Sequence, residues 1–507
     1  MDLFRRKPLD VLIAEGGDEE RGLRKSLTWV DLLSLGIGAI IGAGIFATLG
    51  SAVSGSSSTP PNPAGPGVVA SILLTALCCG FCALCYAEFA SLVPVAGSAY
   101  TYSFATMGEL VAWIIGWDLI LEYAVGNIAV AISWAAYFRQ LLMGFGIEIP
   151  AWICTDYRSA LLASRSVADA AGAVTGLSPE GTVAYQAWVS HPTLFGFPVI
   201  LNLLAASITG LITWLLVVGI KESARVNNVI VILKVATLLF FIAVGAFFVK
   251  PDNWHPFFPG GFSGVWKGAS LIFFAYIGFD AISTAAEECK DPGRDMPRGI
   301  IGSLLVCTVL YVAAALVLTG MIPFAKLSGV ADPLAAALAF VQQDWAAGVI
   351  AFGAVVAMTS VLLVFQLGQP RILMAMSRDG LLGPWFGKIH PKYRTPHVTT
   401  ILTGIFVAFF SAVANIDIVI ELTNIGTLFA FVLVCLGILI LRYREPDRPR
   451  KFRVPFSPFT PLVGIGMCLF LMFKLPIHTW ERFGIWLAIG LVIYFLYGAK
   501  KSRFRKA

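Results

Sequence analysis

Charged residues are scarce in this sequence: Asp, Glu, Lys and Arg make up 13% of 507 residues, whereas 58% are hydrophobic and the mean hydropathy is +0.81. This composition excludes a water-soluble globular protein and is typical of a chain that crosses a bilayer many times. The sequence also lacks an apolar run near its start, because residues 1–28 are charged and polar. We therefore expect no cleavable signal peptide.

Spacings typical of catalytic centres, metal sites and disulfide frameworks are missing as well. The five histidines fall in expected loops or at helix ends without a partnered nucleophile, so we predict neither an enzyme nor a cofactor. Four of the nine cysteines lie in one apolar segment, at Cys78, Cys79, Cys82 and Cys85. A helix places them on differing faces, and packing explains them better than a bound metal.

What the sequence does have is a series of apolar runs, each long enough to cross a hydrocarbon core of about 30 Å. Twelve such runs predict an all-α polytopic membrane protein. The expected spans are 29–50, 67–91, 109–139, 197–219, 229–249, 267–288, 299–322, 346–370, 398–414, 420–441, 459–475 and 483–499.

Lysine and arginine between the spans predict the orientation, because positively charged loops stay in the cytoplasm. With the N-terminus inside, 27 of the 36 basic residues are cytoplasmic, and 8 lie on the opposite side. We therefore expect both termini in the cytoplasm and the protein in the inner (plasma) membrane. This topology accounts for the net charge of +6 without a nucleic-acid partner.

The first span contains a segment that is prone to break. Four glycines occur between Gly36 and Phe46, and each costs a helix interior about 1 kcal/mol relative to alanine. A break at membrane depth exposes backbone N–H and C=O groups, which is tolerable where they line a cavity and bind a ligand. The alternative is close helix packing, because Gly38 and Gly42 form a GxxxG pair. We favour the break, at Gly38, Gly42 and Gly44.

A second irregular segment lies five spans later, from Phe273 to Asp280, with Gly278 and a buried acid in mid-span. Interrupted helices at corresponding positions indicate an inverted-repeat transporter, in which the two breaks face one another near the midplane. Half-helix ends and freed carbonyls then suit a ligand with a carboxylate and an ammonium group. An amino acid carries both.

Four ionisable residues lie inside apolar spans: Asp118, Glu122, Lys234 and Asp280. Each costs several kcal/mol if it faces lipid, so we expect them inside the bundle. Asp118 and Glu122 are four residues apart and share a helix face. Glu122 has three open roles: a partner for Lys234, a proton carrier, or a contact for a substrate ammonium. Asp280 alternatively caps the second half of its broken helix, and Lys234 alternatively snorkels to the interface.

The motifs GAIIGAGIF and FFAYIGFDAISTAAEE, the stretch from Arg371 to Pro384, and Lys234 resemble the amino acid/polyamine/organocation superfamily. Within it, the chain most resembles the bacterial cationic amino acid transporter family. The resemblance implies a leucine-transporter-like fold of five plus five inverted helices with two more appended. The implied division is a cytoplasmic tail at 1–28, a first repeat at 29–249 with an external insertion at 140–196, a second repeat at 267–441, two further helices at 459–499 and a basic tail at 500–507.

The resemblance also implies roles for individual residues. Substrate contacts are expected at Ile40, Ile41, Ala43, Gly44, Ile45, Glu122, Phe274, Ala275, Ile277 and Asp280. Some relatives have a hydroxyl residue where this chain has Ala43. Proton coupling is expected to involve Lys234, Glu122 and Asp118, with the Lys234 ammonium where sodium-coupled relatives bind sodium. Its deprotonation would release the first span.

We therefore predict a secondary active transporter that imports cationic or broad-range L-amino acids together with protons by alternating access. The alternatives are a neutral amino acid carrier or exchanger, and a sensor that binds an amino acid without moving it. The expected partners are the substrate, protons and the lipid bilayer. The sequence leaves open whether the protein is a monomer or an oligomer.

Overall fold

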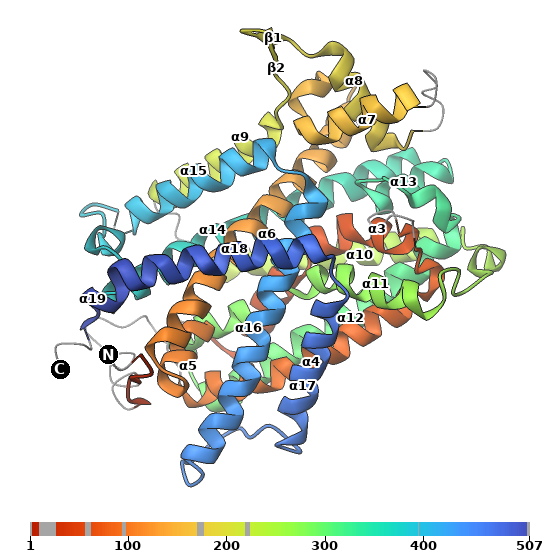
Figure 1. The fold of residues 1–507 in the computed structure, drawn as a ribbon. Helices are drawn as coiled ribbons and strands as arrows, with labels where there is room; N and C mark the ends of the chain where they lie inside the picture. The colour runs from red at the N-terminus through yellow and green to blue at the C-terminus, as the bar shows by residue number, and fades with distance from the viewer. Residues whose placement is uncertain are drawn as a thin grey trace.

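The structure, a computed structural model, describes residues 3–9, 27–55, 62–93, 98–169, 177–218, 224–393 and 395–503. Most of the predicted tail at 1–28, the end of the tail at 500–507 and part of the insertion at 140–196 lie outside these ranges. Within them the chain is almost entirely helical (Figure 1).

Twelve apolar helical segments of the described chain correspond to the twelve predicted spans. Nine are long enough to cross a bilayer by length and composition, and three are shorter. The helices are α2 (Trp29–Ile40), α3 (Leu49–Ser54), α4 (Val68–Leu92), α5 (Ser98–Thr106), α6 (Glu109–Gly144), α9 (Leu203–Val218), α10 (Ala224–Ala246), α11 (Gly261–Ile272), α12 (Pro292–Met321), α13 (Pro333–Phe340), α14 (Asp344–Arg378), α15 (His397–Val413), α16 (Ile416–Arg444), α17 (Phe459–Phe473), α18 (Ile477–Ile493) and α19 (Ala499–Lys501).

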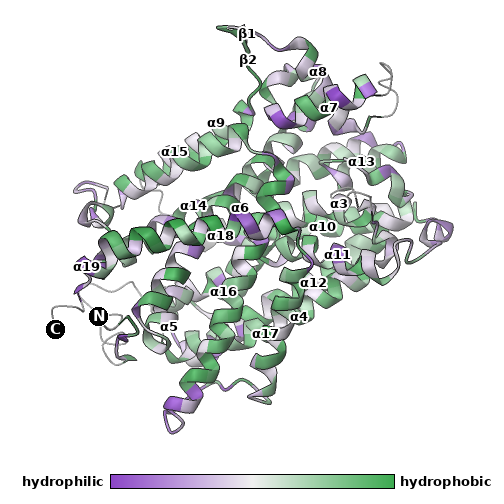
Figure 2. Cartoon of the chain, in the orientation of Figure 1, coloured by the Kyte–Doolittle hydropathy of each residue, from purple (hydrophilic) through white to green (hydrophobic). Residues whose placement is uncertain are grey.

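Hydropathy follows this arrangement. Figure 2 shows the long helices in green, with purple residues gathered in the loops, near the chain ends and in the insertion. The packed interior joins residues from nearly all of the spanning helices. Apolar side chains therefore lie both in the core of the bundle and on the surface expected to face lipid, as in a polytopic membrane protein.

The described part of the insertion at 140–196 contains two α-helices and a small hairpin. Helix α7 (Tyr157–Asp169) packs on α8 (Pro179–Ser190), and strand β1 (Thr193–Leu194) pairs antiparallel with β2 (Phe197–Pro198). The Ser178 side chain accepts a hydrogen bond from the Gly181 N–H, so α8 starts with an N-cap serine followed by proline.

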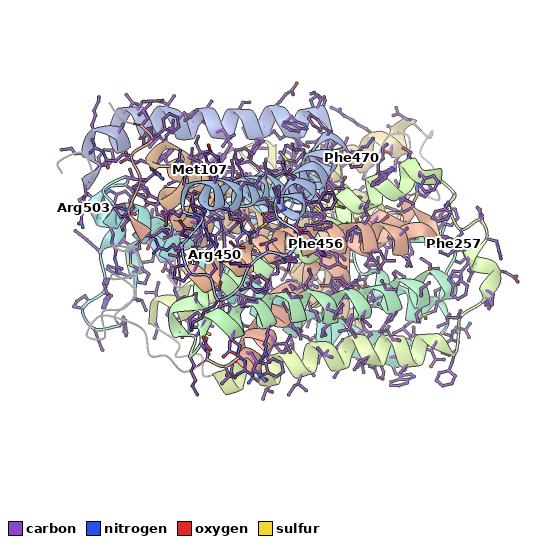
Figure 3. All side chains as sticks on the ribbon, turned by 90° about the horizontal axis from the view of Figure 1, so that it is seen from below. Met107, Phe257, Arg450, Phe456, Phe470 and Arg503 are labelled. Carbon is purple, nitrogen blue, oxygen red and sulfur yellow. The ribbon has the colours of Figure 1, made fainter. Side chains whose placement is uncertain are left out.

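The two ends of the chain meet at the end of the bundle opposite the insertion (Figure 1). The Lys7 ammonium lies 3.3 Å from the Asp379 carboxylate, and the Arg503 N–H donates to the Asp379 carbonyl. Figure 3 places Arg503 and Phe257 at opposite ends of the molecule. A chain that crosses a bilayer an even number of times has both termini on the same side, which agrees with these contacts.

Helix α18 packs across α6 on the outside of the bundle. The indole N–H groups of Trp113 and Trp117 donate to the carbonyls of Gly490 and Trp486, each at 2.9 Å. A Cβ at Gly490 would lie 2.4 Å from the Trp117 ring, so glycine allows this close approach. The last helices are thus appended to the bundle through indole contacts with the third span.

Candidate transport site

The first span is interrupted in the middle of the bundle. Helix α2 ends at Ile40, and Ile41 takes an extended conformation with ψ at 100°. The helix resumes as a π-helix, η1 (Gly44–Thr48), which continues into α3. The first N–H groups of this second half have no partner within the helix. The break therefore leaves donors that point toward the middle of the protein.

Gly38 does not lie at this break, although the sequence predicted that it would. It belongs to the last turn of α2 and is buried. A carbonyl in a last helical turn has no intrahelical partner, and the Lys234 ammonium donates to the Gly38 carbonyl at 2.5 Å. Gly38 thus contributes an acceptor at the end of the helix rather than a backbone kink.

The sixth span is interrupted at the same depth. Helix α11 passes into a short 3₁₀ turn, η5 (Phe273–Tyr276), and Ile277 is extended. Gly278 has φ at +114°, and a Cβ there would lie 2.9 Å from the Ala39 carbonyl oxygen. Both the positive φ and the close approach require glycine. A 3₁₀ helix, η6 (Phe279–Glu288), completes the span.

The two breaks pack directly against each other. A Cβ added at Gly44 would lie 2.2 Å from the Ala275 Cα, so the η1 backbone touches η5. The Tyr311 hydroxyl of α12 lies 3.0 Å from the Ile40 carbonyl oxygen and 3.1 Å from that of Ala275. Tyr311 therefore bridges carbonyls of both breaks. Tyr311 is the one aromatic residue of α12, and no pattern in the sequence indicates that it bonds outside its own helix.

A small central gap lies between the breaks, with a volume of about 10 Å³. Its walls come from Ala39, Ile40, Gly42, Ala43, Gly44, Val130, Phe274, Ile277, Val361 and Phe365. This volume accommodates about one water molecule. An amino acid enters only if helices around the gap move apart, so the structure describes a closed conformation at its centre.

The gap includes half of the residues expected to contact substrate. Ile41, Ile45, Ala275, Glu122 and Asp280 do not line it. Three apolar wall residues were not anticipated: Val130 of α6 and, from α14, Val361 and Phe365. The sequence gives no signal for them, because they are ordinary apolar residues of long helices.

Lys234 is fully buried and contacts the first half of span one rather than the membrane interface. The charges that act on Glu122 come from Asp280 and Asp118, whereas Lys234 acts on the Cys307 thiol. Lys234 and the acids therefore occupy different surroundings. This geometry does not favour the alternative in which Lys234 snorkels to the interface.

The two acids of α6 are buried one turn apart. Neither oxygen of Asp118 has a hydrogen-bond partner among the described residues, and the same holds for Glu122 Oε2. The Thr427 hydroxyl of α16 interacts with Glu122. A Cβ at Gly426 would lie 3.0 Å from Asp118 Oδ1, so this carboxyl packs against the backbone of α16.

Asp280 lies at the start of η6, where its carboxylate interacts with the backbone N–H groups of Gly278, Asp280 and Ala281. This arrangement fits the alternative reading of Asp280 as a helix cap. Its Oδ2 is buried and has no hydrogen-bond partner in the described chain. The residue thus lies next to the second break without facing the central gap.

The cysteines are arranged differently from the expectation. The sulfur atoms of Cys78, Cys82 and Cys468 lie within 4.8 Å of one another. Cys78 and Cys82 share a face of α4 because they are four residues apart, and α17 supplies Cys468. The expectation of differing faces was wrong for Cys78 and Cys82, because residues four apart on a helix lie on the same face.

Comparison with known proteins identifies the family. Residues 27–496 match the amino acid permease family. The branched-chain amino acid permease BcaP of Bacillus subtilis is 47% identical over 99% of this chain and 98% of its own length. The methylthioribose transporter of the same organism is 44% identical over 99% of both chains, and the vacuolar cationic amino acid transporter 4 of Arabidopsis thaliana is 34% identical over 88% of this chain and 68% of its own length. The chain belongs to the amino acid permease family of the amino acid/polyamine/organocation superfamily.

Proposed function

We propose that this protein is a secondary active transporter that imports L-amino acids together with protons. The observation that carries the proposal is the pair of helix breaks that face each other around a small gap. Backbone groups freed at such breaks bind small zwitterions, and alternating opening of the two sides moves them across the bilayer.

Each end of an amino acid has a matching set of backbone groups. The N–H groups of Ala43, Gly44 and Ile45 begin the second half of span one and suit a carboxylate. The carbonyls of Ile40 and Ala275 suit an ammonium, and Tyr311 bonds to them in the closed conformation. Substrate entry thus replaces the Tyr311 hydroxyl with a charged donor.

The walls of the gap favour an apolar substrate side chain. Val130 of α6 and Val361 and Phe365 of α14 supply apolar walls, and a Cβ at Gly42 would lie 2.8 Å from Val361. Apolar walls accept aliphatic side chains and leave a cationic side chain without partners. We therefore propose neutral branched-chain amino acids as the preferred class, which is the neutral alternative to the cationic or broad-range substrates expected from the sequence.

A cationic substrate stays the second candidate because of Glu122. Its Oε2 is buried and without a hydrogen-bond partner among the described residues. If Glu122 turned toward the gap when the helices part, it would offer a counter-charge to a lysine or arginine side chain. The relatives' names include branched-chain and cationic amino acids, so direct measurement must rank the two.

Proton coupling is proposed to act through Lys234. Its ammonium donates to the Gly38 carbonyl at the end of α2, where the helix dipole favours a cation. Loss of the proton removes the charge from this hydrogen bond, which weakens it and allows α2 to move. Asp118 and Glu122 are the other candidates for carrying the proton, since both are buried in α6.

Replacing Lys234 tests this coupling. We expect Lys234→Ala to lose proton-stimulated uptake and to keep substrate binding, because the ammonium contacts the helix and not the gap. Uptake into proteoliposomes with and without a proton gradient measures the first, and equilibrium binding measures the second. Unchanged pH-dependent uptake in the variant contradicts the proposed role.

We also propose the orientation in which both termini face the cytoplasm of a cell whose plasma membrane holds the protein. The excess of Lys and Arg on the side of the termini supports it. The insertion then faces the outside, where substrate arrives for import. Accessibility of cysteines engineered on either side of the membrane measures this orientation.

The main test is uptake of labelled leucine, alanine and arginine into proteoliposomes with a proton gradient, a sodium gradient or neither. We expect proton-stimulated uptake with leucine preferred over arginine. A preference for arginine would favour the second candidate, and sodium dependence would refute the role of Lys234. Binding without uptake under all three conditions would favour a sensor.

A further inference from the structure

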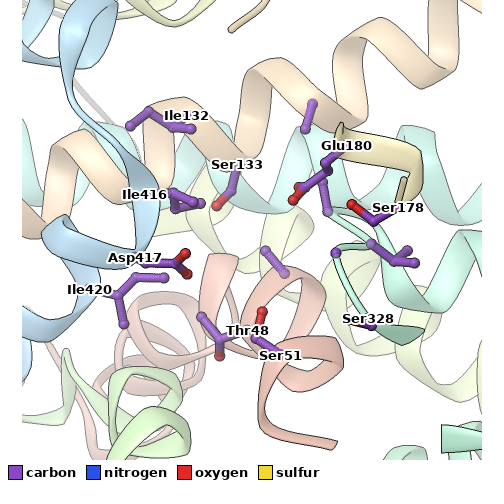
Figure 4. A pocket seen from close by; sticks show the side chains of 15 residues that line it. Thr48, Ser51, Ile132, Ser133, Ser178, Glu180, Ser328, Ile416, Asp417 and Ile420 are labelled. Atoms are coloured by element: carbon purple, nitrogen blue, oxygen red, sulfur yellow. The ribbon is translucent and has the colours of Figure 1, made fainter. Parts of the chain in front are cut away.

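A larger cavity lies at the end of the bundle that carries the insertion. Its volume is about 290 Å³, and its walls come from η1, α3, α6, α8, α16 and the loop at 328–331 (Figure 4). We call it the insertion cavity. Pockets for small molecules start at roughly 300 Å³, so the insertion cavity has room for one amino acid, whereas the central gap does not.

The insertion is fixed to the bundle around this cavity. The Glu180 N–H donates to the Gly329 carbonyl at 3.2 Å. A Cβ at Gly329 would lie 2.3 Å from Ser178 Oγ, so the start of α8 touches the loop closely. On the other side, the Asn415 side chain donates to Ser159 Oγ at 3.1 Å, which joins α7 to the start of α16. The insertion is thus a built part of the cavity wall.

Carboxylates dominate the polar surface of the insertion cavity. Figure 4 shows the side chains of Glu180 and Asp417 pointing into it from different helices. Asp332 and Asp156 also act on Glu180 electrostatically. Two arginines act on acids of this region, Arg139 on Asp332 and Arg158 on Asp417, but neither arginine lines the cavity. The charge that faces the cavity is therefore negative.

An unused hydrogen-bonding group lies in the same cavity. Ser133 of α6 is 2% exposed, and its hydroxyl has no partner among the described residues. Figure 4 shows this hydroxyl directed into the cavity between Glu180 and Asp417. A buried polar group without a partner costs free energy, which a bound ligand would recover. Ser133 thus points to a ligand independently of the carboxylates.

We propose that the insertion cavity binds the ammonium group of an amino acid before it reaches the central gap. Glu180 and Asp417 supply the counter-charge, and the Ser133 oxygen accepts one N–H bond. This inference rests on the proposed transport function for the identity of the ligand. It adds a second substrate site, built partly by the insertion, to the site between the helix breaks.

The two sites are neighbours along the first span. Gly44 lines the central gap and Ala47 lines the insertion cavity, so Ile45 and Phe46 separate them along the chain. The Tyr137 hydroxyl donates to the Phe46 carbonyl at 2.5 Å and holds this segment closed. Because the segment is a π-helix, a conformation often found at functional hinges, its rearrangement would connect the two spaces.

The acidity of Glu180 gives the cavity a pH dependence of known sign. Glu180 is an exposed residue whose carboxyl points into the cavity; partial loss of water around it there, together with the charges of Asp417, Asp332 and Asp156, raises the pKa of Glu180 to about 7. Glu180 is then ionised above pH 7 and neutral below it. Ammonium binding strengthens as the external pH rises, which is opposite in sign to stimulation of uptake by external protons.

Binding of n-butylammonium to the purified full-length protein tests the proposal without requiring transport. By isothermal titration calorimetry, we expect affinity about tenfold higher at pH 8 than at pH 6 in the wild type. Glu180→Gln should lose this affinity and its pH dependence, and Ser133→Ala should lose part of the affinity. Glu148→Gln, at an exposed acid of the same insertion, is the matched control and should bind like the wild type.

Three results distinguish the outcomes. Equal butylammonium binding by wild type and Glu180→Gln overturns the proposal. Equal binding of tetramethylammonium, which has the charge without N–H donors, overturns the role of Ser133. If leucine uptake fails while butylammonium binding is intact and depends on Glu180, the transport function is refuted and the ammonium site is supported.

Where uptake occurs, Glu180→Gln should raise the half-saturating leucine concentration at external pH 8 severalfold without lowering the maximal rate.

Discussion

Two buried carboxylates of this protein have opposite surroundings. Glu88 of α4 is fully buried, and it forms ion pairs with Arg442 and Arg450 and accepts the Val454 N–H at 2.7 Å. Asp118 of α6 is equally buried, and its oxygens have no hydrogen-bond partner in the described chain. The same bundle therefore contains one acid that is fully paired and one that is not.

The difference separates a structural role from a functional one. The pairs of Glu88 connect α4 to the end of α16 and the loop that follows it, so they hold parts of the fold together. An ionised carboxylate without a partner costs several kcal/mol in an apolar interior. Buried ionisable groups without a partner are kept in membrane proteins where their function requires them to be unpaired. We infer that Asp118, with its neighbour Glu122, is kept for transport and Glu88 for stability.

The largest effect on stability is therefore expected at Glu88. Glu88→Ala leaves two arginines without their buried partner, which costs about 3–5 kcal/mol. We expect a marked drop in the thermal unfolding midpoint in detergent, and any protein that survives should keep its response to a proton gradient. Glu445→Ala, which removes a partly exposed pair with Arg448, is the control. It should cost under about 1 kcal/mol, and equal losses in the two variants would contradict the distinction.

The sequence predicted the unpaired acids of α6 better than the paired acid Glu88. Asp118 and Glu122 stand out because charges are rare inside apolar spans. Nothing in the sequence connects Glu88 to its partners Arg442 and Arg450, because they lie more than 350 residues away in the chain. Pairing across the bundle depends on helix packing, which no local pattern encodes.

The same limit applies to the candidate site. Glycine spacing predicted the breaks near Gly42 and Gly278, because glycine has a physical cost in a helix that a pattern can reveal. The closed state of the gap and the bridge made by Tyr311 depend on how α12 and α14 pack against the breaks. A tyrosine in an apolar span has the same local signal whether it bonds to its own helix or to a neighbour.

A smaller effect on stability, with a large effect on coupling, is expected at Glu122. Glu122→Gln keeps the shape of the side chain and its contact with Thr427, but it cannot release a proton. If Glu122 carries the proton, the ratio of uptake with and without a proton gradient should fall by roughly 5- to 100-fold. Initial uptake rates in proteoliposomes measure the ratio. An unchanged ratio would exclude Glu122 and leave Lys234 and Asp118 as the coupling residues of the proposal.

The smallest change in stability is expected at Asp118. Because the carboxyl has no partner among the described residues, Asp118→Asn removes no ion pair, and the amide has nearly the same volume. The free energy of unfolding should change by about 1 kcal/mol or less, far less than for Glu88→Ala, and thermal unfolding in the same detergent compares the two directly. A loss as large as that of Glu88→Ala would mean that Asp118 is ionised and paired in the folded protein, and the contrast between the two acids would then fail.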